Sequence, residues 1–157
     1  MSQEKVEVVR RFNEGHESDD IIPVLSAAVE RLGPEPEPAT VLAVWADDPS
    51  WRHAHADIEW DVSATGAVGS SANGPVEVAA WWADWLDTRE SYVYRVVEYR
   101  DLGEWVLAAA DVSARGRNGI PVEMRIFQIF SVRDGKIDAC RAFLTEPEAL
   151  EAAGLRG

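Results

Sequence analysis

One stretch of the chain carries four potential metal ligands at a regular spacing. In HAHADIE, His53, His55, Asp57 and Glu59 occupy every second position. On an extended strand this spacing puts all four side chains on one face, and histidine with carboxylate is a combination that binds divalent metals. Ligands along one straight strand diverge, however, and the sequence offers no third cluster to close a site. We therefore expect a solvated strand start, with no metal and no cofactor.

A second conspicuous stretch is WWADWL, which begins at Trp81 and holds three of the seven tryptophans. On a helix, Val78, Trp81 and Trp85 lie at i, i+3 and i+7, the spacing of an apolar stripe that faces a core. Trp82 and Leu86 lie beside this stripe. Burying one indole removes about 200 Å² of surface from water. The pattern predicts that Trp81 and Trp85 attach a helix to a sheet, with one indole in a pocket wall.

Composition and charge limit the partners that the protein can have. With 157 residues, 46% of them hydrophobic, the chain has the size and apolar content of one domain. Fifteen basic against 28 acidic residues give a net charge of −13, which repels nucleic acid, anionic membranes and polyphosphates. The single cysteine, Cys140, excludes an intramolecular disulfide and a cysteine-based zinc site.

The sequence also bears on localisation. Its N-terminal residues MSQEKVEVVRR are charged and lack an apolar signal core. No apolar run approaches the roughly 18 residues of a membrane-spanning helix. We therefore expect a soluble, cytoplasmic protein that binds neither nucleic acid nor membrane.

Hydrophobic periodicity predicts helices first and mostly strands afterwards. Helical patterns cover residues 3–14, 21–32, 39–48 and about 75–88. Strand patterns cover residues 55–63, 91–99, 103–116, 120–132 and 136–144. Asn-Gly and Asp-Gly pairs at 117–119 and 133–135 signal hairpins, and a Thr145-x-x-Glu148 capping box begins a last helix. This order predicts an α+β fold, in which a cone-shaped, curved mixed sheet wraps around N-terminal helices and encloses an apolar pocket.

Two segments interrupt this pattern within a single domain of residues 1–157. Residues 17–38 hold the acidic ESDD and the alternating prolines of GPEPEPAT, which cannot continue a helix. We expect an insertion or an extra helix there. The glycine- and serine-rich TGAVGSSANG, residues 65–74, predicts a loop.

The strand over residues 120–132 is apolar on both faces. Strict alternation gives one face with Met124, Ile126, Gln128 and Phe130 and another with Phe127 and Ile129. One face would line the cone. The other needs a cover, most simply a second copy of the chain, so we expect a homodimer.

The closing stretch VEMRIFQIFSVRDGKIDACRAFLTEPEALEAAGL resembles a known family, as do MSQEKVEVVRRF, HADIEWDVSATG and GPVEVAAWWADWL. Residues 1–16 and 39–155 resemble the SnoaL-like branch of the nuclear-transport-factor-2-like superfamily, which includes ketosteroid isomerases, limonene epoxide hydrolases and polyketide cyclases. The resemblance implies a cone-shaped α+β barrel that dimerises through its outer sheet face. It says little about a reaction, because this fold hosts enzymes and non-catalytic binders alike.

Compared with ketosteroid isomerases, the chain keeps one catalytic position and loses others. Their general-base aspartate at the end of the first strand matches Asp61 in DIEWDV. A lone carboxylate inside an apolar cone would have a raised pKa and could move protons near neutral pH; the alternative is an exposed aspartate at a strand end. Their oxyanion-hole residues match Phe12, which has no hydroxyl, and Gln128, which could still orient a ligand or be a satisfied buried amide.

Compared with limonene epoxide hydrolases, two members of the Asp-Arg-Asp relay are missing. Asp111 matches the first aspartate, but Ala109 stands where the arginine belongs and Ala142 where the second aspartate belongs. Polyketide cyclases of this type also use an acid on that last strand, so Ala142 departs from their pattern too. Asp111 alone could be a pocket acid or could cap a strand pair.

We therefore expect a small apolar metabolite (a polyketide, terpenoid or steroid-like compound) to bind in the cone and undergo isomerisation, hydration or cyclisation by proton transfer, without a cofactor. Asp61 and Asp111 are the expected catalytic residues. The expected ligand contacts are Phe12, Trp60, Trp81, Trp85, Tyr94, Gln128 and Phe130. The alternative is a non-catalytic ligand-binding or dimerisation domain, which the incomplete catalytic sets favour.

Overall fold

Helices dominate the first third of the chain and strands the remainder. The computed structural model describes residues 2–15, 22–65, 71–87, 89–116, 119 and 121–154. The first elements are α1 (Ser2–Glu14), α2 (Ile22–Leu32), α3 (Pro38–Ala46) and the short 3-10 helix η1 (Trp51–His53). They are followed by β1 (Ala54–Asp61), a second 3-10 helix η2 (Ser63–Thr65), β2 (Ser71–Asn73) and α4 (Gly74–Asp87). The chain continues through β3 (Arg89–Asp101), β4 (Val106–Gly116), β5 (Pro121–Arg133), β6 (Lys136–Phe143) and α5 (Glu146–Ala152).

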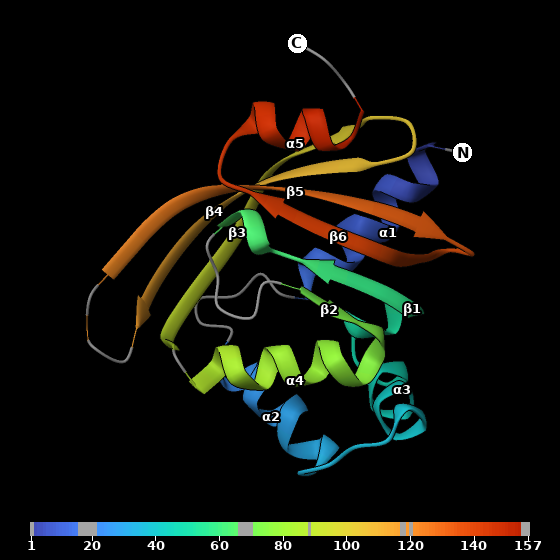
Figure 1. Ribbon diagram of the computed structural model, residues 1–157, viewed down its shortest axis with the longest axis vertical. Coiled ribbons are helices and arrows are strands. Elements are labelled where there is room, and N and C mark those ends of the chain that lie inside the picture. Colours follow the sequence, from blue (N-terminus) through green and yellow to red (C-terminus); the bar gives the residue numbers. More distant parts are fainter. Residues whose placement is uncertain are drawn as a thin grey trace.

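Six strands form one mixed sheet in the order β2-β1-β6-β5-β4-β3. The strands β3 to β6 make an antiparallel meander, and β1 joins it parallel to β6. Figure 1 shows how strongly the long strands curve, with α5 on the side of the sheet opposite α4. The curved mixed sheet around the N-terminal helices confirms the predicted α+β fold class.

Local signals set several boundaries as expected. Asp134 and Gly135 have φ values of 56° and 74°, the left-handed backbone that a two-residue hairpin between β5 and β6 requires. Thr145 caps α5 by accepting a hydrogen bond from the Glu148 amide at 3.3 Å. The Arg117-Asn118 part of the other hairpin signal lies outside the described residues.

The two interrupting segments differ in outcome. Ser71–Asn73, which we expected in a loop, form β2 and pair antiparallel with the end of β1. Ala72 is buried in the core between two exposed polar residues, which is the alternation of a short edge strand. Within 17–38, α2 occupies Ile22–Leu32 and the chain reaches α3 at Pro38. Residues 16–21 lie outside the described part, and whether the segment is an insertion stays a prediction.

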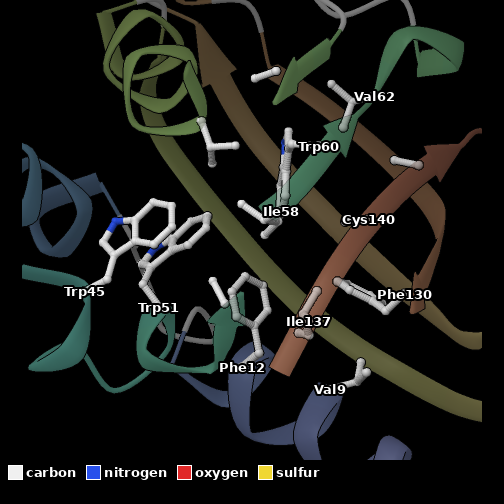
Figure 2. Close-up of a cluster of buried hydrophobic side chains, with 14 of the residues drawn as sticks. Val9, Phe12, Trp45, Trp51, Ile58, Trp60, Val62, Phe130, Ile137 and Cys140 are labelled. Atoms are coloured by element: carbon white, nitrogen blue, oxygen red, sulfur yellow. The ribbon is translucent and has the colours of Figure 1, made fainter. Parts of the chain in front are cut away.

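Aromatic side chains fill most of the space between the concave face of the sheet and the helices. Trp45 stacks on Trp51 with ring centroids 4.8 Å apart, and Phe12 meets Trp51 edge-on at 5.1 Å. Trp60 reaches this group from β1, 5.8 Å from Trp51 (Figure 2). Phe130 of β5 closes the group behind Phe12 at 6.1 Å.

The helix α4 packs through a slightly different stripe from the one expected. Its most buried residues are Val78, Ala79 and Leu86, and the tryptophan between them on this face is Trp82, whose ring lies 5.5 Å from Trp60. Val78, Trp82 and Leu86 are spaced i, i+4 and i+8. Trp81 is half-buried like Trp82 and packs against the same core cluster.

The apolar outer face of β5 is covered from within the chain. Ile129 is fully buried together with Leu107 and with Ala149 of α5, and Phe127 packs against the same cluster. The cover comes from α5, and the short amphipathic pattern of this helix gives no direction of packing in the sequence. A homodimer stays a prediction, and the exposed apolar side chains available to it include Val97, Val122, Met124 and Leu144.

A close approach between Gly15 and Ser50 fixes the end of α1 against the turn before β1. A Cβ atom on Gly15 would lie 1.7 Å from Ser50 Oγ and 2.9 Å from Ser50 Cβ. The turn resists movement, because Asp48 Oδ1 accepts hydrogen bonds from the amides of Ser50 and Trp51 at 2.8 and 2.9 Å.

We expect Gly15→Ala to destabilise the protein by about 1–3 kcal/mol, the usual cost of overpacking, although alanine favours helix more than glycine does. Urea unfolding measures this change in free energy. The matched control is the same substitution in a Ser50→Gly background, which removes both clashing atoms and leaves only the residue 50 amide nitrogen at 3.2 Å. An equal cost in the two backgrounds would contradict the contact.

Candidate functional site

A small cavity lies in the inner core, where α1, β1, α4, β3 and β5 meet. Its free volume is about 40 Å³, room for roughly three water molecules at about 10–15 Å³ each. Figure 2 shows Phe12 and Trp60 projecting into this interior from α1 and β1. The lining consists of aromatic rings and two amides: Phe12, Asn13, Trp60, Trp82, Tyr92, Tyr94 and Gln128.

The polar part of this lining is a buried hydrogen-bonded cluster centred on Tyr94. The Tyr94 hydroxyl donates to Gln128 Oε1 and lies 3.2 Å from Asn13 Oδ1, so its single proton faces two amide oxygens. Gln128 Nε2 donates in turn to Cys140 Sγ at 3.9 Å. Burial raises the pKa of the Cys140 thiol far above its ordinary value, so the sulfur keeps its proton and the cluster is uncharged.

Small residues in β4 let this cluster form. Tyr94 lies on β3 and Gln128 on β5, and β4 runs between these strands. Ala108 of β4 pairs directly with Gln128, and Ala110 belongs to the same core cluster as Tyr94; both alanines are fully buried. Because a methyl group rises little above the sheet, side chains from the two flanking strands can meet over β4.

Two donors on fully buried residues of the cavity lining have no acceptor within the described part of the chain. They are Asn13 Nδ2 and Trp60 Nε1, on residues that are 1% and 4% exposed. A buried donor without a partner costs about 1–3 kcal/mol. The arrangement therefore suits an occupant that brings a hydrogen-bond acceptor.

Asp61 lies away from this cavity, on the other face of β1. Ile58 and Trp60 are buried on the inner face, and side chains alternate along the strand, so Trp60 and Asp61 cannot both face the cone. Asp61 Oδ1 accepts hydrogen bonds from the hydroxyl and the amide of Ser63 at 2.6 and 3.0 Å. These bonds, the hydroxyl's above all, lower the pKa of Asp61, and Arg141 adds to the lowering. The expected raised pKa is therefore contradicted, while a catalytic role for Asp61 stays a prediction.

Asp111 faces outward from β4. Arg125, its direct partner on β5, donates to both carboxylate oxygens, from Nε at 2.8 Å and from a guanidinium NH2 group at 3.2 Å. The hydrogen bonds from Arg125 lower the pKa of Asp111. Asp111 borders a broad outer groove of about 510 Å³ together with Val93 and Glu123. This geometry agrees with the alternative in which Asp111 pairs across two neighbouring strands, here β4 and β5. A catalytic role for Asp111 stays a prediction.

The expected ligand contacts divide into three groups. Four of the seven line the cavity: Phe12, Trp60, Tyr94 and Gln128. Phe130 is fully buried behind Phe12. Trp81 and Trp85 are outside the lining, and Trp85 packs edge-on against Tyr92 at 4.6 Å.

Three lining residues were missed by the sequence reasoning: Asn13, Trp82 and Tyr92. A signal existed for Asn13, which lies four positions after Val9 on the apolar stripe of α1. Both residues are almost fully buried. An amide on a core-facing helix position is unusual enough to mark a functional or structural polar site.

The HAHADIE segment is held by local hydrogen bonds and ion pairs. His55 Nδ1 accepts from the Asp57 amide at 3.0 Å, and the Asp57 carboxylate pairs with Arg133 at 3.0 Å. The register of β1 against β6 shifts between Ala54 and Glu59, which breaks the regular spacing. Among the described residues, no group of three or more His, Cys, Asp or Glu side chains is arranged to hold a metal ion. In the same part of the chain, no helix is long and apolar enough to cross a membrane.

We expect the carboxyl group of Asp61 to titrate below the ordinary aspartate value of about 3.9, as carbon-detected NMR would measure. Because its pKa is lowered by folding, its contribution to stability is present above pH 4 or so and is lost as the pH falls through the folded-state value. Ser63→Ala removes the main cause and should raise the titration midpoint toward the ordinary value. A midpoint near neutral pH would contradict this geometry and favour a general base.

Solved structures with the same fold share little sequence with this chain. A nuclear-transport-factor-2-like protein from Burkholderia xenovorans LB400 is 21% identical, with a TM-score of 0.58 over 96% of this chain and 95% of that one. A hypothetical protein from Catenulispora acidiphila, with a ketosteroid isomerase-like fold and in complex with trimethylamine, is 19% identical, with a TM-score of 0.53 over 78% and 95%. A proposed SnoaL-like polyketide cyclase from Jannaschia sp. CCS1 is 16% identical, with a TM-score of 0.52 over 87% and 94%. At these identities the similarity establishes the fold alone.

Sequence comparison identifies the family. No curated protein matches the chain significantly. The model of the SnoaL-like domain matches residues 27–139, well over half of the chain, and begins inside the 17–38 segment. The match includes β1, α4 and the strands that carry Tyr94 and Gln128. The protein therefore belongs to the SnoaL-like domain family.

Proposed function

We propose that this protein binds a small, mostly apolar molecule that contains a ring, with the ring or one end of the molecule in the cavity between α1 and the sheet. The observation that carries the proposal is the lining itself, five aromatic rings around a buried amide and hydroxyl cluster. Ligand sites are commonly apolar hollows with a few well-placed polar groups. Membership of the SnoaL-like family supports the same class of function.

The size of the cavity limits what fits. About 40 Å³ accepts only a few heavy atoms, so a ligand of polyketide or steroid size would have to move part of the wall. Trp82 and Tyr92 are half-buried members of the lining, whereas Phe12, Trp60 and Tyr94 are held inside the core. Movement of the two half-buried side chains is the cheaper route to a larger site.

The lining favours binding over proton transfer. Among the described residues that surround the cavity there is no carboxylate and no histidine, and such side chains are the usual general bases. Asp61 and Asp111 face away from the cavity and have lowered pKa values. Proton-transfer catalysis through Asp61 remains the competing proposal. It requires the β1 end to rearrange when the ligand binds.

We expect neutral cyclic ketones and aromatic alcohols to change the tryptophan fluorescence saturably, because Trp60 and Trp82 line the cavity. Gln128→Leu should weaken the binding about three- to tenfold, because the Tyr94 hydroxyl loses the acceptor that orients it in the lining. The matched control is Glu123→Gln on the exposed outer groove, which should leave the affinity unchanged. Absence of saturable binding, or an equal loss in the control, would contradict the site.

Deuterium exchange separates binding from catalysis. A ketone ligand incubated in D2O with the protein should exchange its α-protons no faster than the ketone alone, as proton NMR would measure. Accelerated exchange that Asp61→Asn abolishes would instead establish Asp61 as a proton acceptor. The same ketone bound with equal affinity by both proteins provides the control for folding.

A further inference from the structure

Two donors on fully buried residues of the cavity lining, Asn13 Nδ2 and Trp60 Nε1, have no acceptor among the described residues. The Asn13 amide oxygen lies 3.2 Å from the Tyr94 hydroxyl, so the amide nitrogen is turned away from that hydroxyl. The Trp60 indole is enclosed by Phe12, Trp81 and Trp82, with ring centroids 6.4, 6.1 and 5.5 Å away. Both nitrogen atoms are buried away from bulk water.

The charge around the cavity favours a neutral occupant. The described lining has no cationic side chain to balance an anion, and the chain carries a net charge of −13. An unpaired charge in such an interior is far more costly than an unpaired dipole. A carbonyl, ether or hydroxyl oxygen supplies lone pairs without that cost.

We infer that Asn13 Nδ2 and Trp60 Nε1 together recognise an uncharged acceptor oxygen of the ligand, so that the cavity selects oxygen-bearing rings over hydrocarbons and over rings that only donate. This inference rests on the proposed binding function and assigns its specificity. Water can satisfy the same donors when the cavity is free of ligand. A ligand oxygen reproduces those hydrogen bonds, whereas a hydrocarbon displaces the water and leaves the donors unpaired.

Three five-membered rings of similar size test the selection. Tetrahydrofuran accepts hydrogen bonds but does not donate them, pyrrole donates a hydrogen bond through its N–H group, and cyclopentane neither accepts nor donates. We expect tetrahydrofuran to bind about tenfold more tightly than cyclopentane and more tightly than pyrrole, the difference expected for hydrogen bonds that would otherwise be unmade. Titrations followed by proton–nitrogen NMR spectra measure affinity and also report the indole N–H and side-chain amide signals.

The NMR signals show which donors respond. Tetrahydrofuran should shift the Trp60 indole N–H and the Asn13 NH2 signals downfield, whereas cyclopentane should not. Trp60→Phe assigns the indole signal. Asn13→Leu, which keeps the volume but removes the amide, should bring the affinity for tetrahydrofuran close to that for cyclopentane, and circular dichroism checks that it folds.

The possible results separate the two proposals. If tetrahydrofuran and cyclopentane bind equally in the wild-type protein, or pyrrole binds best, the selection by Asn13 and Trp60 is wrong while the binding function stands. If none of the three rings binds, and the larger ketones and aromatic alcohols also fail, the cavity is not a ligand site and both proposals fall. The wild-type titration decides this even if the Asn13 variant does not fold.

Discussion

The buried hydroxyl of Tyr94 needs hydrogen-bond partners, and these partners connect three elements in the interior of the protein. Tyr94 lies on β3, and its two partners, Asn13 and Gln128, come from α1 and β5. All three are almost completely buried, and a buried polar group left alone costs more than a formed hydrogen bond contributes. The docking of α1 and the register of β3, β4 and β5 are therefore coupled through one uncharged cluster.

The aromatic side chains around this cluster determine how much room is left for a ligand. Trp51, Trp60, Trp81 and Trp82 pack in contact with one another across α4, β1 and η1. They occupy the inner side of the curved sheet, and a small cavity lies beside them at Tyr94. The tryptophan-rich helix is thus mainly a scaffold, with Trp82 as its contribution to the cavity wall.

The fold could be predicted largely from local patterns, because period-two strands, the Asp-Gly turn at 134–135 and the Thr145 cap are decided by neighbouring residues. The alternation of Ile58 and Trp60 toward the core was also readable in the sequence. The same alternation puts Asp61 on the face of β1 opposite Trp60. The resemblance to ketosteroid isomerases implied instead that Asp61 faces the cone. The geometry decides the pKa, through Ser63.

What the sequence could not supply were contacts between distant segments. Asn13 and Tyr94 are 81 positions apart, and no local pattern indicates that they meet. The cover of Ile129 by α5 depends on where a seven-residue helix folds back. The alanines at 108 and 110 were visible, but their value as space for Tyr94 and Gln128 depends on the order of the strands.

The most direct test of the account is to measure intermolecular nuclear Overhauser effects between a bound cyclic ketone and the protein. Binding in the cavity predicts contacts from the ligand ring to Phe12, Trp60 and Tyr94, whose side chains line it. Contacts instead to Val93, Ser113 and Met124, which border the outer groove of β3, β4 and β5, would contradict it.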